Sequence, residues 1–160
     1  MAAKIIAGVL LTAAVLTGCS SAANSTSAAP PAKASRTSRL ACKQRYLAWK
    51  NGPAKSAAER FSAAQTALSA AGSKENNASG IATAAKAEGQ AAARLDAFPV
   101  PACADPRGYL AAVLTDVRTA AAKAATASGL SSLVTALAPL KTVPGLESDF
   151  TAELKRTTGI

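Results

Sequence analysis

The chain has 160 residues, no histidine, 4% aromatic residues and a formal net charge of +9. This length allows one domain of ordinary size and excludes a large multidomain enzyme, and the missing histidine excludes every mechanism that depends on an imidazole. The charge is unevenly distributed, because residues 1–58 contain eight basic residues and no acid, and the first acid is Glu59. A basic excess is typical of nucleic-acid-binding proteins, so the interpretation depends on the compartment.

Residues 1–18 have the pattern of an export signal. Lys4 precedes an uncharged and mostly apolar run over residues 5–16. This run is shorter than the roughly 20 apolar residues that a membrane-spanning helix needs. It matches the apolar part of a signal peptide. We therefore predict an exported protein, and export argues against a nucleic-acid partner.

The apolar run ends in the sequence Leu16-Thr17-Gly18-Cys19. This motif resembles the lipobox of bacterial lipoproteins, in which an apolar residue and two small residues precede a cysteine. The resemblance implies that Cys19 receives a diacylglyceryl group and that cleavage makes it the first residue of the mature protein. It also implies anchoring to the outer face of the cell membrane. Two acyl chains hold a protein stably on a bilayer, whereas one chain does so only marginally.

Residues 19–37 follow as the expected lipidated N-terminus and tether. This segment is rich in serine, alanine and proline and offers little to bury, which predicts disorder. With Cys19 acylated, Cys42 and Cys103 remain, and an even pair in an oxidising compartment predicts a disulfide. The alternative is a redox or metal-binding pair, which the lack of histidine and of Cys-x-x-Cys spacing disfavours.

Residues 38–160 are expected to form one alanine-rich helical domain. Alanine, the best helix former, occupies 43 of the 160 positions, and no stretch alternates apolar and polar residues as a half-buried strand does. The helical spacing and the Gly, Pro and Ser breaks predict, in chain order, helices over about 38–51, 53–72, 75–97 and 103–128, a short piece at 130–140, and a last helix at about 146–156.

These segments predict an all-α antiparallel bundle of four main helices with short C-terminal helices. In the first helix Cys42, Tyr46 and Trp49 share a face, and Leu40 and Leu47 lie seven residues apart. Small residues allow close helix packing but bury little area each, so we expect modest stability. A Cys42–Cys103 link would tie the first helix to the start of the fourth.

Motifs that carry chemistry are scarce. There is no Ser-x-x-Lys or Gly-x-Ser-x-Gly pattern, no phosphate-binding glycine loop and no cluster of metal ligands, so we expect no catalytic residues, cofactor or metal. Asp149 and Glu153 lie four residues apart and are interpreted as part of a solvated face. Glu88 falls within the apolar series of the third helix. We expect a buried stem with the carboxylate in water, and the alternative is a buried functional carboxylate.

Two aromatic residues lie among cations in the first helix. Tyr46 and Trp49 neighbour Lys43, Arg45 and Lys50, and such interleaving occurs in nucleic-acid and sugar sites. The preferred interpretation is that Trp49 packs into a thin core near the disulfide.

Two further stretches carry a family resemblance. WKNGP at residues 49–53 and PACADPRGY at residues 101–109 resemble a group of small uncharacterised lipoproteins from actinobacteria. The resemblance implies a cell-surface location and no particular activity or binding residue.

The sequence favours a non-enzymatic, membrane-anchored module that binds or scaffolds something at the cell envelope. The alternatives are a helical small-ligand binder and, less favoured, a carboxylate-based or redox enzyme. The basic segment suggests a second contact with anionic lipid or an anionic wall polymer, and the alternative is that its charges only solvate the first helix. The residues of this segment are Lys33, Arg36, Arg39, Lys43, Arg45, Lys50 and Lys55.

Overall fold

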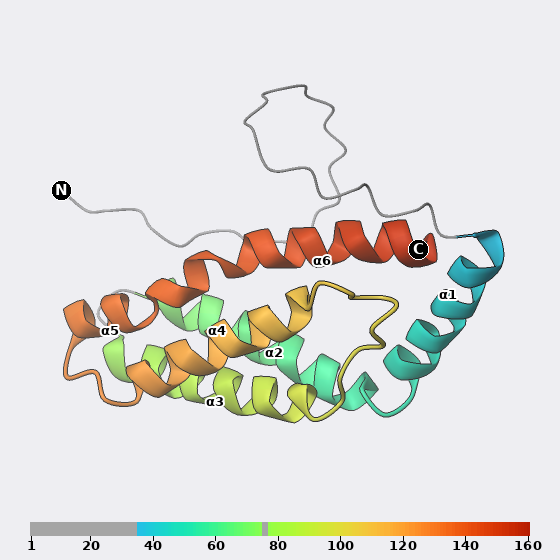
Figure 1. Ribbon diagram of the computed structural model, residues 1–160. Coiled ribbons are helices and arrows are strands. Elements are labelled where there is room, and N and C mark those ends of the chain that lie inside the picture. The colour runs from blue at the N-terminus through green and yellow to red at the C-terminus, as the bar shows by residue number, and fades with distance from the viewer. Residues whose placement is uncertain (1–34, 75–76) are drawn as a thin grey trace, which may run out of the picture.

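The computed structural model describes residues 35–74 and 77–160, and these residues contain helices, turns and loops but no strand (Figure 1). The all-α prediction is therefore confirmed for this part of the chain. The predicted signal peptide, Cys19, Lys33 and the tether up to residue 34 lie outside the described residues. The last three residues assigned to the tether, 35–37, are instead the cap and the start of the first helix.

Four main helices come first and two short elements separate them from a last long helix. The order is α1 (Arg36–Asn51), α2 (Lys55–Gly72), α3 (Ala78–Asp96), α4 (Tyr109–Ala124), α5 (Leu130–Ala136), the 3₁₀ helix η1 (Ala138–Lys141) and α6 (Val143–Thr158). Helices α2, α3 and α4 run antiparallel with α3 in the middle, and α6 covers α4 (Figure 1). Helix α1 stands at one end of the bundle against α6 and α2.

The prediction that the fourth helix starts at residues 103–106 is wrong. The helix begins at Tyr109, and Asp105 caps it from four residues before this start. Its two carboxylate oxygens accept hydrogen bonds from the N–H groups of Tyr109 and Leu110, both at 2.9 Å. Gly108 adopts a left-handed conformation with φ of 70°, which favours glycine and turns the chain into the helix. The segment before it is a series of turns.

Smaller boundary differences also have local causes. Helix α3 begins at Ala78 rather than near 75, because the Asn77 side chain accepts a hydrogen bond from the Gly80 N–H at 3.1 Å and caps it there. Helix α6 begins at Val143, three residues before the prediction. Pro144 lies in its first turn, where a missing N–H removes no hydrogen bond. Pro53 lies in the turn between α1 and α2.

The core consists of three small clusters rather than one. The largest contains Phe61, Leu95, Val113, Leu114 and Val117 with alanines of α2 and α3. The second contains Ile81, Ala85, Ala124, Leu133 and Ala136. The third joins α1 to the loop before α4 and contains Cys42, Tyr46 and Ala104.

The alanine-rich composition permits a very close approach of α3 and α4. A Cβ atom added at Gly89 would collide with the Cβ atom of Ala121. Phe98 follows the end of α3, and 37% of its surface is exposed.

Candidate functional site

Helix α1 carries five cations and no acid, and four of the cations lie on one side of the helix. At 100° per residue, four of its cations fall within an arc of about 60°, beside the buried face of Cys42, Tyr46 and Trp49. Lys43 is half-buried and the other three are exposed. We call these four residues the basic flank: Arg36, Arg39, Lys43 and Lys50.

The other three cations of the predicted basic segment lie elsewhere. Arg45 is on the opposite side of the buried face of α1. Lys55 begins α2, and its Nζ lies 3.8 Å from the carboxylate of Glu59. Lys33 is outside the described residues. The structure therefore brings together four of the seven predicted residues.

An exposed leucine adjoins the basic flank. Leu40 lies four residues after Arg36 and three before Lys43, so its side chain neighbours both on the helix surface. It is 58% exposed, whereas Leu47 one repeat further packs partly against the third cluster. The seven-residue spacing of the two leucines indicates a helix but does not predict the exposure of Leu40. Its angular distance from Cys42 and Tyr46 was the available signal.

The junction between α1 and the rest of the domain is held by sulfur and aromatic contacts. The sulfur atoms of Cys42 and Cys103 lie at disulfide distance, and their Cα atoms are 5.8 Å apart, within the normal range for a disulfide. The rings of Tyr46 and Trp49 lie 5.6 Å apart, and the Trp49 indole N–H donates to the carbonyl oxygen of Phe98 at 2.7 Å. Tyr46 is buried, and Trp49 is partly buried against the third cluster near the disulfide pair, as the preferred interpretation predicted for Trp49.

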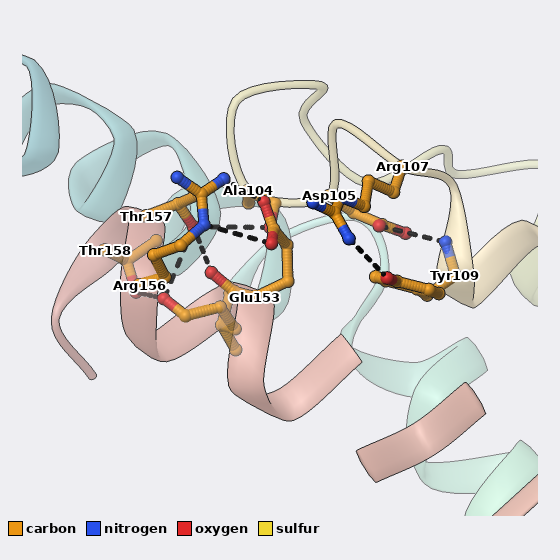
Figure 2. Close-up of polar contacts among 9 residues, drawn as sticks. Ala104, Asp105, Arg107, Tyr109, Glu153, Arg156, Thr157 and Thr158 are labelled. Carbon is orange, nitrogen blue, oxygen red and sulfur yellow. Dashed lines mark hydrogen bonds and ion pairs between the residues drawn. The ribbon is translucent and has the colours of Figure 1, made fainter. Parts of the chain in front are cut away.

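Polar contacts gather where the end of α6 meets the loop before α4, and one of them, from Thr157 to Ala104, joins the two segments (Figure 2). Glu153 is only 6% exposed and forms an ion pair with Arg156, whose Nε donates at 3.1 Å. The hydroxyl of Thr157 donates to the carbonyl oxygens of Ala104 at 3.4 Å and of Glu153 at 2.9 Å. Arg107 donates to the Tyr109 hydroxyl at 3.1 Å.

The interpretation of Asp149 and Glu153 as one solvated face is wrong for Glu153. Only Asp149 is exposed. The hydrogen bond from Arg156 lowers the pKa of Glu153 and keeps it ionised. Glu153 and Asp105 are already engaged in hydrogen bonds, so neither is a free carboxylate.

Glu88 is the most unusual titratable group of the described residues. The Glu88 carboxylate makes no hydrogen bond among the described residues, and no fully buried side-chain oxygen of these residues lacks a partner, so the carboxylate keeps a narrow contact with water, as expected. The residue as a whole is nevertheless only 5% exposed. Its neighbours on α3 explain this, since Ala85 belongs to the second core cluster and Ala92 to the largest. Glu88 thus lies between the two clusters. Burial raises its pKa to about 7, and the negative charge of Glu147 adds to the shift.

Hollows in the described surface are shallow. A groove of about 320 Å³ between α3 and α4 is lined mainly by alanines, with Lys86 and Arg118 at its rim, and Arg118 pairs with Asp96 at 2.7 Å. A second hollow lies where residues 78–82 approach residues 127–133. Neither hollow has an acidic residue in its lining, so the structure provides no pocket lined by acids at these places.

Within residues 35–74 and 77–160, no three Cys, Asp or Glu side chains gather as a metal site would require. No helix of the same residues is long and apolar enough to cross a membrane. Comparison with protein-family models, curated proteins and solved structures gave no match to this chain.

Proposed function

We propose that the protein is an exported lipoprotein, anchored by a diacylated Cys19 to the outer face of a bacterial cell membrane. Its helical domain serves as a non-enzymatic binding or scaffolding module at the cell envelope. The lipobox-like motif at residues 16–19 supports the anchor. The hydrogen bonds and ion pairs of the described acids, and their positions away from the hollows, support a role without catalysis.

One observation carries the proposal. Of the three cysteines in the chain, Cys42 and Cys103 lie at disulfide distance, and this leaves Cys19 for the acyl group. Disulfides persist in oxidising compartments and are rare in the cytosol. The disulfide distance between Cys42 and Cys103 and the lipobox-like motif at Cys19 therefore both support a location outside the cytosol.

The arrangement of the acids supports a binding role over an enzymatic one. Asp105 caps α4, and Glu153 pairs with Arg156. Glu88 has no hydrogen bond or ion pair among the described residues, but it lines neither of the two hollows. Hydrolysis by a carboxylate pair needs both acids to face one substrate site, and the neighbouring Glu88 and Glu147 line neither hollow.

The test is mass spectrometry of the protein from the membrane fraction of a bacterium that expresses the full chain. We expect a mature N-terminus at Cys19 that carries a diacylglyceryl group. Cys19→Ala should accumulate unprocessed or be released to the medium, while the neighbouring Ser20→Ala variant should behave as the wild type. An unmodified Cys19→Ala protein that remains processed and membrane-bound would refute the anchor.

A further inference from the structure

We propose that the basic flank of α1, together with Leu40, docks onto the anionic phospholipid surface of the membrane. The proposal deepens the proposed function, because it names the surface that the anchored domain contacts. It rests on that function, and the surface consists of four cations and one exposed leucine.

The charge of the flank is uncompensated. Helix α1 contains no acidic residue, and none of the four cations forms an ion pair with a described acid. Lys55, just beyond the helix, does form one with Glu59 and is therefore left out. Cations near an anionic bilayer attract it, and salt limits this attraction to about 8 Å at physiological ionic strength. Only cations grouped on one face can all come that close at the same time.

Leu40 favours a bilayer over a soluble polyanion as the partner. Its side chain is 58% exposed and is flanked by Arg36 and Lys43. A helix that lies on a membrane embeds apolar side chains at the boundary between headgroups and acyl chains while its cations meet the headgroups. A hydrated polymer of phosphate groups would bind the cations equally well but would leave Leu40 in water.

The position of α1 in the fold allows the contact. Residues 35–41 are all exposed, and burial begins only at Cys42. Figure 1 shows α1 at the end of the bundle, away from α5. The chain from Cys19 to Arg36 spans 17 residues and reaches at most about 60 Å when extended. Among the described helices, α1 is the nearest to Cys19 along the chain, and this length lets its exposed side reach the membrane.

The experiment measures binding of the chain 19–160 with Cys19→Ser, which has no lipid but retains every described helix. Sedimentation is carried out with vesicles of phosphatidylglycerol and phosphatidylcholine in equal parts, and with phosphatidylcholine alone. We expect binding only to the anionic vesicles, and loss of binding near 0.5 M salt. The combined variant Arg36→Gln, Arg39→Gln, Lys43→Gln and Lys50→Gln should bind at least about tenfold more weakly. Leu40→Ser should bind about threefold more weakly or worse.

The matched control removes the same number of charges from other faces, all exposed and without a described ion pair. It combines Lys74→Gln, Lys86→Gln, Lys123→Gln and Lys141→Gln. We expect its affinity for the anionic vesicles to lie within about twofold of that of the unsubstituted chain, because salt screens charges that do not approach the vesicle surface. Equal weakening by both combined variants would overturn the proposal, since net charge would then explain the binding.

Two further outcomes decide the partner. If soluble poly(glycerol phosphate) displaces the vesicles and binds Leu40→Ser as tightly as the parent chain, the partner is a polyanion and the lipid proposal is wrong. No binding to anionic vesicles at low salt also overturns it. Because this chain carries no acyl group, these results are independent of the Cys19 test. A failure of one proposal can thus be told from a failure of the other.

Discussion

Glu88 and Glu147 are carboxyl groups from α3 and α6 that lie close enough for the charge of one to raise the pKa of the other. Glu147 accepts a hydrogen bond from the Gln65 side chain of α2 at 2.9 Å, whereas Glu88 has no such partner among the described residues. Three helices therefore contribute polar side chains to one layer of the bundle, in which Glu88 is buried and Gln65 and Glu147 are partly buried. An ionised Glu88 is costly in this layer.

The stability of the domain should fall as the pH rises through 7. The folded state raises the pKa of Glu88 from 4.5 to about 7, so between these values the folded state binds more protons than the unfolded state. The contribution of Glu88 is fully present below pH 4.5 and is lost as the pH passes 7, with an upper limit of about 3 kcal/mol. Chemical unfolding at pH 5, 7 and 8.5 measures it.

The variant Glu88→Gln should remove this pH dependence and exceed the wild type in stability at pH 8.5. The exposed Glu59→Gln serves as the control and should keep the dependence. If wild type and Glu88→Gln lose stability in parallel from pH 5 to 8.5, Glu88 is not the responsible group.

The close contact of α3 with α4 predicts that a glycine-to-alanine substitution at Gly89 lowers the stability of the domain. Replacing glycine by alanine inside a helix normally stabilises it by up to about 1 kcal/mol. At Gly89 the new methyl group would collide with Ala121, so Gly89→Ala should destabilise the domain by about 1–3 kcal/mol. Gly145→Ala in α6 meets open space and should be neutral or stabilising. Thermal unfolding followed by circular dichroism distinguishes the two, and equal shifts would contradict the contact.

The Cys42–Cys103 pair should make a large contribution to the stability of this thin core. The two cysteines are 61 residues apart, and closing such a loop stabilises a fold by about 4 kcal/mol in the chain-entropy model. Reduction, or Cys42→Ser, should lower the melting temperature. A thiol assay on the denatured, unreduced chain 19–160 with Cys19→Ser should find no free thiol, and two free thiols would show that the bond is absent.

Asp105 should contribute more to the stability of the domain than an exposed aspartate does. It is only 5% exposed and caps two backbone N–H groups of α4, so Asp105→Ala should cost about 1–2 kcal/mol of unfolding free energy. The exposed Asp149→Ala should change stability by less than about 0.5 kcal/mol. Denaturant titration of both variants is the measurement, and similar values for both would argue against the cap.

The main helices were predictable because their signals are local. Alanine content, helical spacing and breaks at Gly72 and residues 128–129 are properties of the sequence alone. The start of α4 was mispredicted because Asp105 followed by proline is a strong local signal for a helix. The Pro101 carbonyl, however, accepts the N–H groups of Ala104 and Asp105 and extends the turn.

The candidate site was predictable only in part. The basic segment was evident from charge, and the 3.6-residue period would have separated the basic flank from Arg45. The burial of Glu88 and Glu153 could not be predicted from the period of their own helices. The burial of Glu88 depends on α4 and α6, and that of Glu153 depends on the loop before α4, and these segments lie elsewhere in the sequence. A single helix shows which residues share its face, but not whether another segment covers that face.

The indole of Trp49 gives the protein a built-in optical reporter. It is the only tryptophan of the chain, and it lies on α1 beside the third core cluster that contains Cys42. Its emission spectrum therefore follows the docking of α1, while the helical signal in circular dichroism comes mostly from the other helices. If α1 detaches on reduction before the bundle melts, the emission should shift to longer wavelength at a lower temperature than the loss of helix.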